Sequence, residues 1–216
     1  MTQAQSVSEL LAYCQSHEVD LLAVTKYATV AQIQALYAAG IRRIGENKVQ
    51  SMQEKQAVFN PPDLEWVLIG HLQRNKVKKA VAVSHRIESI DSIRLAEAVN
   101  AAAQAAGRVI PVYVQLNVTQ AAQKQGFSVS DFWDALPSLM ALPNIAVTGC
   151  MAMGPHPASD TEILAAFQIA KSVVAQCQEQ YPAIAALSMG MSHDYPLAVT
   201  AGSTQIRLGS QLLEWL

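Results

Sequence analysis

Short apolar runs alternate along the chain with longer segments whose apolar residues fall three or four positions apart. The first run, Leu21 to Val24, is followed by Thr25, Lys26 and Tyr27, and its length predicts a strand buried on both faces, as in parallel sheets. The intervening spacing is typical of amphipathic helices. This unit of strand and helix occurs eight times. The predicted strands cover residues 21–27, 41–47, 65–70, 86–91, 109–117, 145–151, 185–189 and 204–209.

Helix boundaries follow from capping residues. Thr29 and Ser92 stand where an N-cap is expected, and Ser159 with Glu162 has the spacing of a capping box. One further helix precedes the first strand, and a short helix from Ser210 closes the sequence. A helix that begins near Ser130 is expected to be interrupted at Pro137, because proline cannot donate the backbone hydrogen bond.

Eight alternating units without a linker predict one domain over residues 1–216, an α/β protein with a closed (β/α)₈ barrel. An open doubly wound sheet is the alternative architecture. It would ordinarily carry Gly-x-Gly-x-x-Gly after its first strand, and this sequence has no such motif there.

Composition narrows the possible functions. A formal net charge of -2 with 15% charged residues argues against binding to nucleic acid or to a membrane surface. Cys14, Cys150 and Cys177 share no short spacing, so neither a disulfide framework nor a zinc site is expected. No signal peptide is visible. We therefore expect a soluble, cytoplasmic protein.

A closed barrel brings the carboxyl ends of all its strands to one rim, where ligands bind. Lys26 ends the first strand. Partial desolvation there would lower the pKa of its ammonium and make it a candidate amine nucleophile; a lysine whose head simply reaches solvent is the alternative. The residues that would share this rim are Lys26, Asn47, His71, Asp91, Asn117, Met151, Ser192 and Arg207.

Small residues after the last two strands indicate an anion site. Ser188 to Ser192 follows the seventh strand, and Gly209 and Ser210 follow the eighth, where this fold commonly binds phosphate. Ordinary turns also use such residues. A phosphate site on the same rim as a reactive lysine points to a phosphorylated aldehyde held as a Schiff base, and so to pyridoxal 5′-phosphate.

The sequence resembles the pyridoxal phosphate homeostasis proteins, also described as the proline synthetase co-transcribed family. The resemblance spans the whole chain. It implies a single-domain barrel like the amino-terminal domain of alanine racemase, of fold-type III, with the cofactor on Lys26. The segments that carry it are residues 21–26, 45–47, 69–76, 90–92, 149–151, 187–192 and 201–209.

Site roles follow from the resemblance, residue by residue. Lys26 would form the Schiff base, Arg207 would face the pyridine nitrogen, and Asn47 and Met151 would line the ring. The residues expected to hold the phosphate are Ser192, Gly209 and Ser210, with backbone from Ser188, Met189, Gly190 and Met191. The chain departs from the family at His71 and Arg74, and residues 120–123 lack the acidic residue often seen before Lys124-Gln125-Gly126.

Arg207 separates a binder from an enzyme. Arginine does not accept a proton and cannot keep the ring nitrogen protonated as a carboxylate would, so the ring would be a poor electron sink. The few residues after Ser210 also leave no room for a second domain with another acid-base group. We expect a monomeric carrier of pyridoxal phosphate without substantial turnover, acting in cofactor homeostasis and in amino-acid and keto-acid balance. Its expected protein partners are apoenzymes that depend on pyridoxal phosphate.

Two alternatives remain. One is a fold-type III racemase or decarboxylase that acts on an unusual substrate. The other is a phosphosugar-binding barrel such as an isomerase, in which Lys26 would be only an electrostatic clamp.

Overall fold

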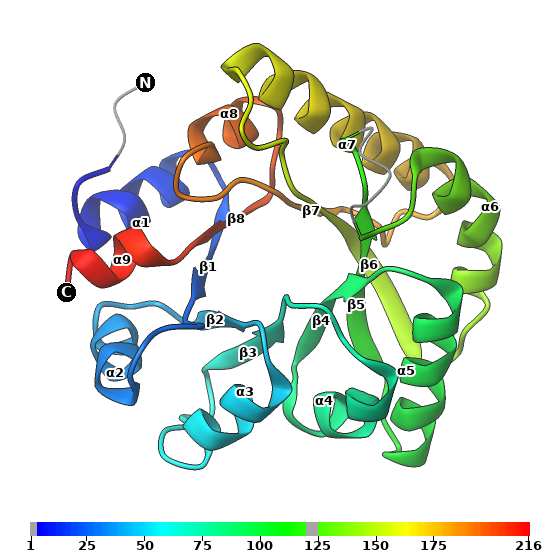
Figure 1. The fold of residues 1–216 in the computed structure, drawn as a ribbon, viewed down its shortest axis with the longest axis horizontal. Coiled ribbons are helices and arrows are strands. Elements are labelled where there is room, and N and C mark those ends of the chain that lie inside the picture. Colours follow the sequence, from blue (N-terminus) through cyan, green and yellow to red (C-terminus); the bar gives the residue numbers. More distant parts are fainter. Residues whose placement is uncertain (1–3, 120–124) are drawn as a thin grey trace.

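The protein is a closed barrel of eight parallel strands enclosed by helices (Figure 1). This computed structural model describes residues 4–119 and 125–216. The segment 120–123 and Lys124, singled out in the sequence, lie outside these ranges. The strands are β1 Asp20–Val24, β2 Arg43–Glu46, β3 Glu65–Leu68, β4 Arg86–Ile90, β5 Ile110–Leu116, β6 Ile145–Ala152, β7 Ala186–Ser188 and β8 Gln205–Leu208.

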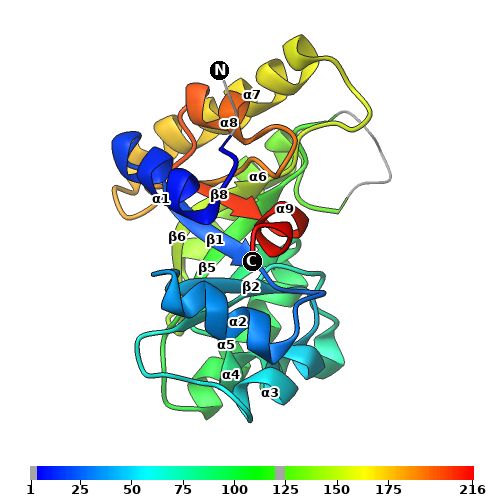
Figure 2. The same ribbon diagram turned by 90° about the vertical axis from the view of Figure 1, so that its left-hand side faces the viewer.

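Helices connect consecutive strands. Seen from the side, α2 to α5 lie on one side of the strands and α6 to α8 on the other (Figure 2). The helices are α1 Val7–Ser16, α2 Val30–Ala38, α3 Val49–Gln56, the 3₁₀ turn η1 Arg74–Lys76, α4 Val77–Val83, α5 Ile93–Ala105, α6 Val129–Met140, α7 Asp160–Gln180, α8 Tyr195–Thr200 and α9 Ser210–Glu214. Within the described residues, no helix is long and apolar enough to cross a lipid bilayer.

Pairing of the first strand with the last closes the barrel. Strand β1 pairs with β8 in the register Asp20 with Gln205 through Ala23 with Leu208, and every other neighbouring pair is parallel. The predicted closed barrel is confirmed, and the open sheet is excluded.

The predicted break at Pro137 is wrong. Helix α6 continues through this proline to Met140. Phe132, Leu136 and Leu139 are buried on one face of the helix, and their packing holds its last turn although Pro137 has no N–H to donate.

Apolar side chains fill the space between strands and helices, whereas the barrel interior combines polar groups with apolar ones such as Leu22, the register partner of Arg207. Trp66, Phe132 and Phe167 are fully buried in the outer layer. Inside, Arg86 on β4 donates to the side-chain oxygen of Gln205 on β8 over 2.6 Å. Because β4 and β8 are not neighbours in the sheet, this hydrogen bond crosses the barrel interior.

Candidate cofactor-binding site

A hollow of about 360 Å³ opens at the carboxyl ends of the strands. Its size is typical of a small-molecule site. The structure brings eight of the eleven predicted site residues to its lining from five different strand ends: Lys26, Asn47, Met151, Met191, Ser192, Arg207, Gly209 and Ser210.

Lys26 lies two residues beyond the end of β1. Its side chain is exposed, and its Nζ stands 4.9 Å from the centroid of the Tyr27 ring. The prediction that the ammonium of Lys26 is partly desolvated is therefore wrong, because the lysine follows the strand instead of ending it. The amine is accessible to a ligand that enters the hollow.

A buried ion pair fixes the backbone just before Lys26. Glu46, 1% exposed at its side chain, accepts from Lys55 Nζ over 2.6 Å and from Thr25 Oγ1 over 2.7 Å. Lys55 Nζ also donates to the carbonyl oxygen of Thr25 over 2.7 Å. Two side chains from β2 and α3 thus hold both the hydroxyl and the carbonyl of Thr25, the residue that precedes Lys26.

The opposite side of the hollow is built from small residues. Gly209 precedes α9 at its N-cap position, and no side chain caps this helix, so backbone N–H groups of its first turn are left for a ligand. A Cβ at Gly209 would lie 3.2 Å from the carbonyl oxygen of Val24, which shows how closely this loop approaches β1. Ser192 and Ser210 add hydroxyls.

Arg207 is almost completely buried beside the hollow. Its Nη1 donates to the carbonyl and to the hydroxyl oxygen of Ser188, both over 2.8 Å, and its Nη2 donates to the carbonyl of Ala152 over 2.9 Å. Burial lowers the pKa of Arg207, while Glu88 and Asp194 act in the opposite direction. Three hydrogen bonds therefore fix the plane of the guanidinium.

Ser188, Met189 and Gly190 do not line the hollow, contrary to the expectation that their backbone contacts the phosphate. All three are buried. Ser188 Oγ donates to Glu88, Met189 packs in the apolar core, and the carbonyl of Gly190 accepts from the backbone N–H of Arg207. These residues support the site from behind: the Ser188 side chain points into the barrel, that of Met189 packs outside the strands, and the Gly190 carbonyl pairs with the backbone of β8.

Several lining residues were missed in the sequence, among them Tyr27, Met153, His193 and Leu213. Met153 stands two positions after Met151, and Leu213 three positions after Ser210. Strand and helix periodicities could have indicated both.

His193 had no such signal. Its Nε2 lies 3.3 Å from Oδ2 of Asp194, whose Oδ1 accepts from the backbone N–H of Met191 over 2.5 Å. The buried Asp194 carboxylate thus ties together the loop that carries Met191, Ser192 and His193.

His71, Asp91 and Asn117 do not line this hollow. His71 Nδ1 lies 3.1 Å from Asp91 Oδ2 at the ends of β3 and β4. Asn117 Oδ1 accepts from the N–H and the hydroxyl of Thr119. The expectation that all rim residues face one site was too broad, since a barrel rim is wider than a small ligand.

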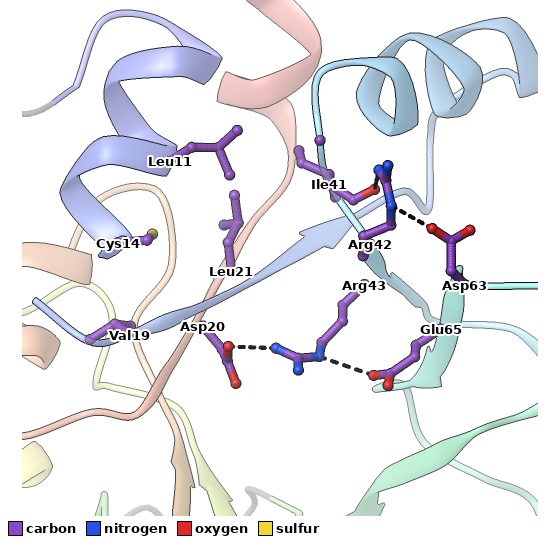
Figure 3. A pocket seen from close by; sticks show the side chains of 11 residues that line it. Leu11, Cys14, Val19, Asp20, Leu21, Ile41, Arg42, Arg43, Asp63 and Glu65 are labelled. Atoms are coloured by element: carbon purple, nitrogen blue, oxygen red, sulfur yellow. Dashed lines mark hydrogen bonds and ion pairs between the residues drawn. The ribbon is translucent and has the colours of Figure 1, made fainter. Parts of the chain in front are cut away.

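A second hollow, of about 300 Å³, lies at the amino ends of β1, β2 and β3 (Figure 3). Its charged groups satisfy one another. Arg43 pairs with Asp20 and Glu65, and Arg42 pairs with Asp63. At this face such pairs serve stability, because the rim that carries chemistry in this fold is the opposite one.

Comparison with known proteins agrees with this architecture. The family model described as "Alanine racemase, N-terminal domain" matches residues 4–213. The pyridoxal phosphate homeostasis protein of Synechocystis is 34% identical over 90% of each chain, and that of Escherichia coli K12 is 32% identical over 90% of this chain and 85% of its own. The chain belongs to the pyridoxal phosphate homeostasis family. This membership confirms the resemblance seen in the sequence.

Solved structures of other proteins are also similar to this chain. PipY of Synechococcus elongatus, determined with pyridoxal phosphate bound, is 39% identical and superposes with a TM-score of 0.88 over 96% of this chain and all of its own. Alanine racemase of Clostridium difficile has a TM-score of 0.78 at 14% identity, over 94% of this chain and 57% of its own, which shows a shared fold alone.

Proposed function

We propose that this chain binds pyridoxal 5′-phosphate covalently through Lys26 and serves in the homeostasis of that cofactor. One observation supports this most strongly. An accessible lysine near the start of the chain and an uncapped, small-residue loop near its end line the same 360 Å³ hollow. When bound, pyridoxal phosphate supplies an aldehyde that combines with a lysine amine.

The residues present fit this ligand. Ser192, Gly209 and Ser210 offer hydroxyl and N–H donors of the kind a phosphate requires, and at Gly209 a side chain would crowd β1. Met151 and Asn47 would flank the ring. Arg207, fixed by Ser188 and Ala152, would meet the ring nitrogen as a hydrogen-bond donor.

Absence of substantial turnover is part of the proposal. The ring of the cofactor is a strong electron sink only when its nitrogen is protonated. Arg207 can donate a hydrogen bond to that nitrogen but cannot accept one from its N–H, so it would not stabilise the protonated form. The relatives in Synechocystis and Escherichia coli are named for homeostasis. We also propose a monomer in the cytoplasm that exchanges its cofactor with PLP-dependent apoenzymes; free, buried Cys14, Cys150 and Cys177 agree with a reducing compartment.

Absorption spectroscopy with borohydride trapping tests the proposal. Purified protein incubated with pyridoxal phosphate should develop a visible band, and borohydride should fix one cofactor on Lys26, found by peptide mass spectrometry. Lys26→Ala should lose both signals and keep its circular dichroism spectrum. Lys79→Ala, an exposed lysine outside the hollow, is the matched control. An unchanged band in Lys26→Ala would refute the assignment.

A racemase is the rival that the lining itself favours, because Tyr27 and His193 are titratable groups at the hollow. Incubation of the loaded protein with L-alanine separates the two functions. Steady loss of optical activity, abolished by Tyr27→Phe or His193→Gln, would contradict a pure binding role. We expect the optical activity to persist.

A further inference from the structure

A third hollow, of about 490 Å³, lies on the carboxyl rim beside the cofactor hollow and shares Asn47 with it. It is bounded by the loop after β2 and the loop after β3. These loops touch, since a Cβ at Gly70 would lie 2.2 Å from the carbonyl oxygen of Asn47. The side chains that matter for its chemistry are Lys48, Gln50, His71, Gln73 and Lys76.

The lining of this hollow is cationic and contains no carboxylate. Across residues 4–119 and 125–216, the ammonium groups of Lys48 and Lys76 make neither an ion pair nor a hydrogen bond. The arginines at the other end of the barrel differ, because Arg42 and Arg43 are each matched by an acidic residue (Figure 3). Two unmatched cations around one concave surface favour an anionic ligand.

The backbone adds to this preference. Lys48 is the N-cap of α3 but makes no side-chain cap, and Val49 and Gln50 of the first turn line the hollow. Helices α1, α2, α5, α6 and α7 all have a serine or threonine cap. The first N–H groups of α3, with the positive end of its dipole, are therefore left for a ligand.

The long-range charge distribution points the same way. Residues 42–108 contain eleven of the fifteen lysines and arginines but only seven of the seventeen acidic residues. This part of the chain is positive although the whole chain carries -2. Four of these cations, Arg74, Lys76, Lys78 and Lys79, lie in η1 and α4, directly after the loop that bounds the hollow.

We propose that the hollow between Lys48 and Lys76 is a second anion site, which binds the phosphate group of a small molecule. The ammonium groups of Lys48 and Lys76 and the free N–H groups of α3 would bind the phosphate group. Gln50 and Gln73 would form hydrogen bonds with the rest of the small molecule. This inference goes beyond the proposed cofactor function and does not depend on Lys26.

Amide NMR titration of the cofactor-free protein tests it, because separate resonances report the two anion sites. Inorganic phosphate and glycerol 3-phosphate are added in separate titrations. We expect saturable shifts at the amides of Val49 and Gly70. Saturation by both ligands would identify the phosphate group itself as the determinant, and saturation by the ester alone would assign the site to phosphorylated metabolites.

Two variants of equal charge supply the control. Lys48→Gln with Lys76→Gln should weaken the binding about tenfold or more, the effect of losing charged contacts worth roughly 1.4 kcal/mol or more together. Lys78→Gln with Lys79→Gln removes two exposed lysines of α4 outside the hollow and should leave the affinity within about twofold. Equal weakening in both variants would overturn the proposal, since the effect would then be nonspecific charge.

Resonances at Gly209 and Ser210 distinguish failure of this inference from failure of the proposed function. Shifts confined to these two residues would support a phosphate site in the cofactor hollow and overturn the second site. Saturation at Val49 and Gly70 that persists in Lys26→Ala would support the second site even if no cofactor adduct forms. Preserved dispersion of the amide spectrum shows that each variant is folded.

Discussion

Gly190 connects the two strands that carry the site. Its φ of +93° lies in the region that favours glycine, and its carbonyl accepts from the N–H of Arg207 over 2.9 Å. A Cβ at this position would lie 2.5 Å from Cβ of Ala198 in α8. The residue thus has two independent reasons to be glycine.

Gly190→Ala should lower the free energy of unfolding by about 2–5 kcal/mol, from backbone strain and from the clash with Ala198. Gly107→Ala is the matched control, because Gly107 also has positive φ but no atom lies within 4 Å of a Cβ there. It should cost only about 1–2 kcal/mol. Urea denaturation measures both losses, and equal losses would show that the contact with α8 is unimportant.

The limits of sequence reasoning are clear at this scale. Lys26 and Arg207 could be placed at the hollow because Lys26 follows one recognisable strand and Arg207 lies near the carboxyl end of another. Ser188 and Gly190 belong to the same type of motif, yet the Ser188 side chain is used inside the barrel and the Gly190 carbonyl pairs with the backbone of β8. The position of a residue in a motif does not reveal where its side chain or carbonyl points, because that direction depends on contacts with other strands.

At the scale of elements, local signals predicted where helices begin. Thr29, Ser92 and Ser159 each accept from the backbone N–H three residues later, as expected for an N-cap. Helix ends and strand lengths were less predictable. Pro137 fits inside α6 because its helix is held by tertiary packing, which a local rule cannot contain.

The loop of Lys26 depends on a contact that no local pattern indicates. Glu46 from β2 and Lys55 from α3 meet at Thr25. The pair is nearly buried, with side chains 1% and 13% exposed. Its geometry arises only when β1 and β2 are paired in the barrel.

Lys55→Met should destabilise the protein by about 3 kcal/mol, because it leaves the carboxylate of Glu46 buried without its cation. It should also weaken cofactor binding, since the Thr25 carbonyl keeps the N–H of Ala28 but loses the Lys55 ammonium as a donor, which loosens the Lys26 loop. Urea denaturation and titration with pyridoxal phosphate, followed by absorbance, measure the two effects. Lys79→Met, at an exposed position, should change neither.

A double variant checks the cause. In Glu46→Gln with Lys55→Met the buried charge is gone, so its loss of stability should be smaller than the sum of the two single losses. Strict additivity would argue that the two side chains act separately. Weaker cofactor binding with unchanged stability would instead confine their role to positioning the loop.

On the scale of the whole molecule, the barrel is closed by side chains as well as by backbone. Strand β7 has three residues, and a single register pair joins it to β8. Glu88 of β4 adds side-chain contacts to both strands, because it accepts from Ser188 of β7 and Gln205 of β8, as well as from Arg86 of its own strand. The predicted succession of strands was right, but the polar contacts of the interior were not foreseen. The pattern of apolar residues in a strand does not show which side chains of distant strands meet inside a barrel.

Glu88→Gln should therefore act on one part of the barrel more than on the rest. The carboxylate is fully buried and balances the charges of Arg86 and, through Ser188, of Arg207. Its neutralisation should cost about 3 kcal/mol, because the buried guanidinium of Arg207 and the partly buried one of Arg86 both lose a counter-charge. Hydrogen exchange followed by mass spectrometry should accelerate in β7 and β8 before β2 and β3.

Glu65→Gln is the control. Its partner Arg43 is partly exposed, so the substitution should cost less than about 1 kcal/mol and leave the order of exchange unchanged. Uniform acceleration in Glu88→Gln would mean that the backbone ladder, and not this network, closes the barrel.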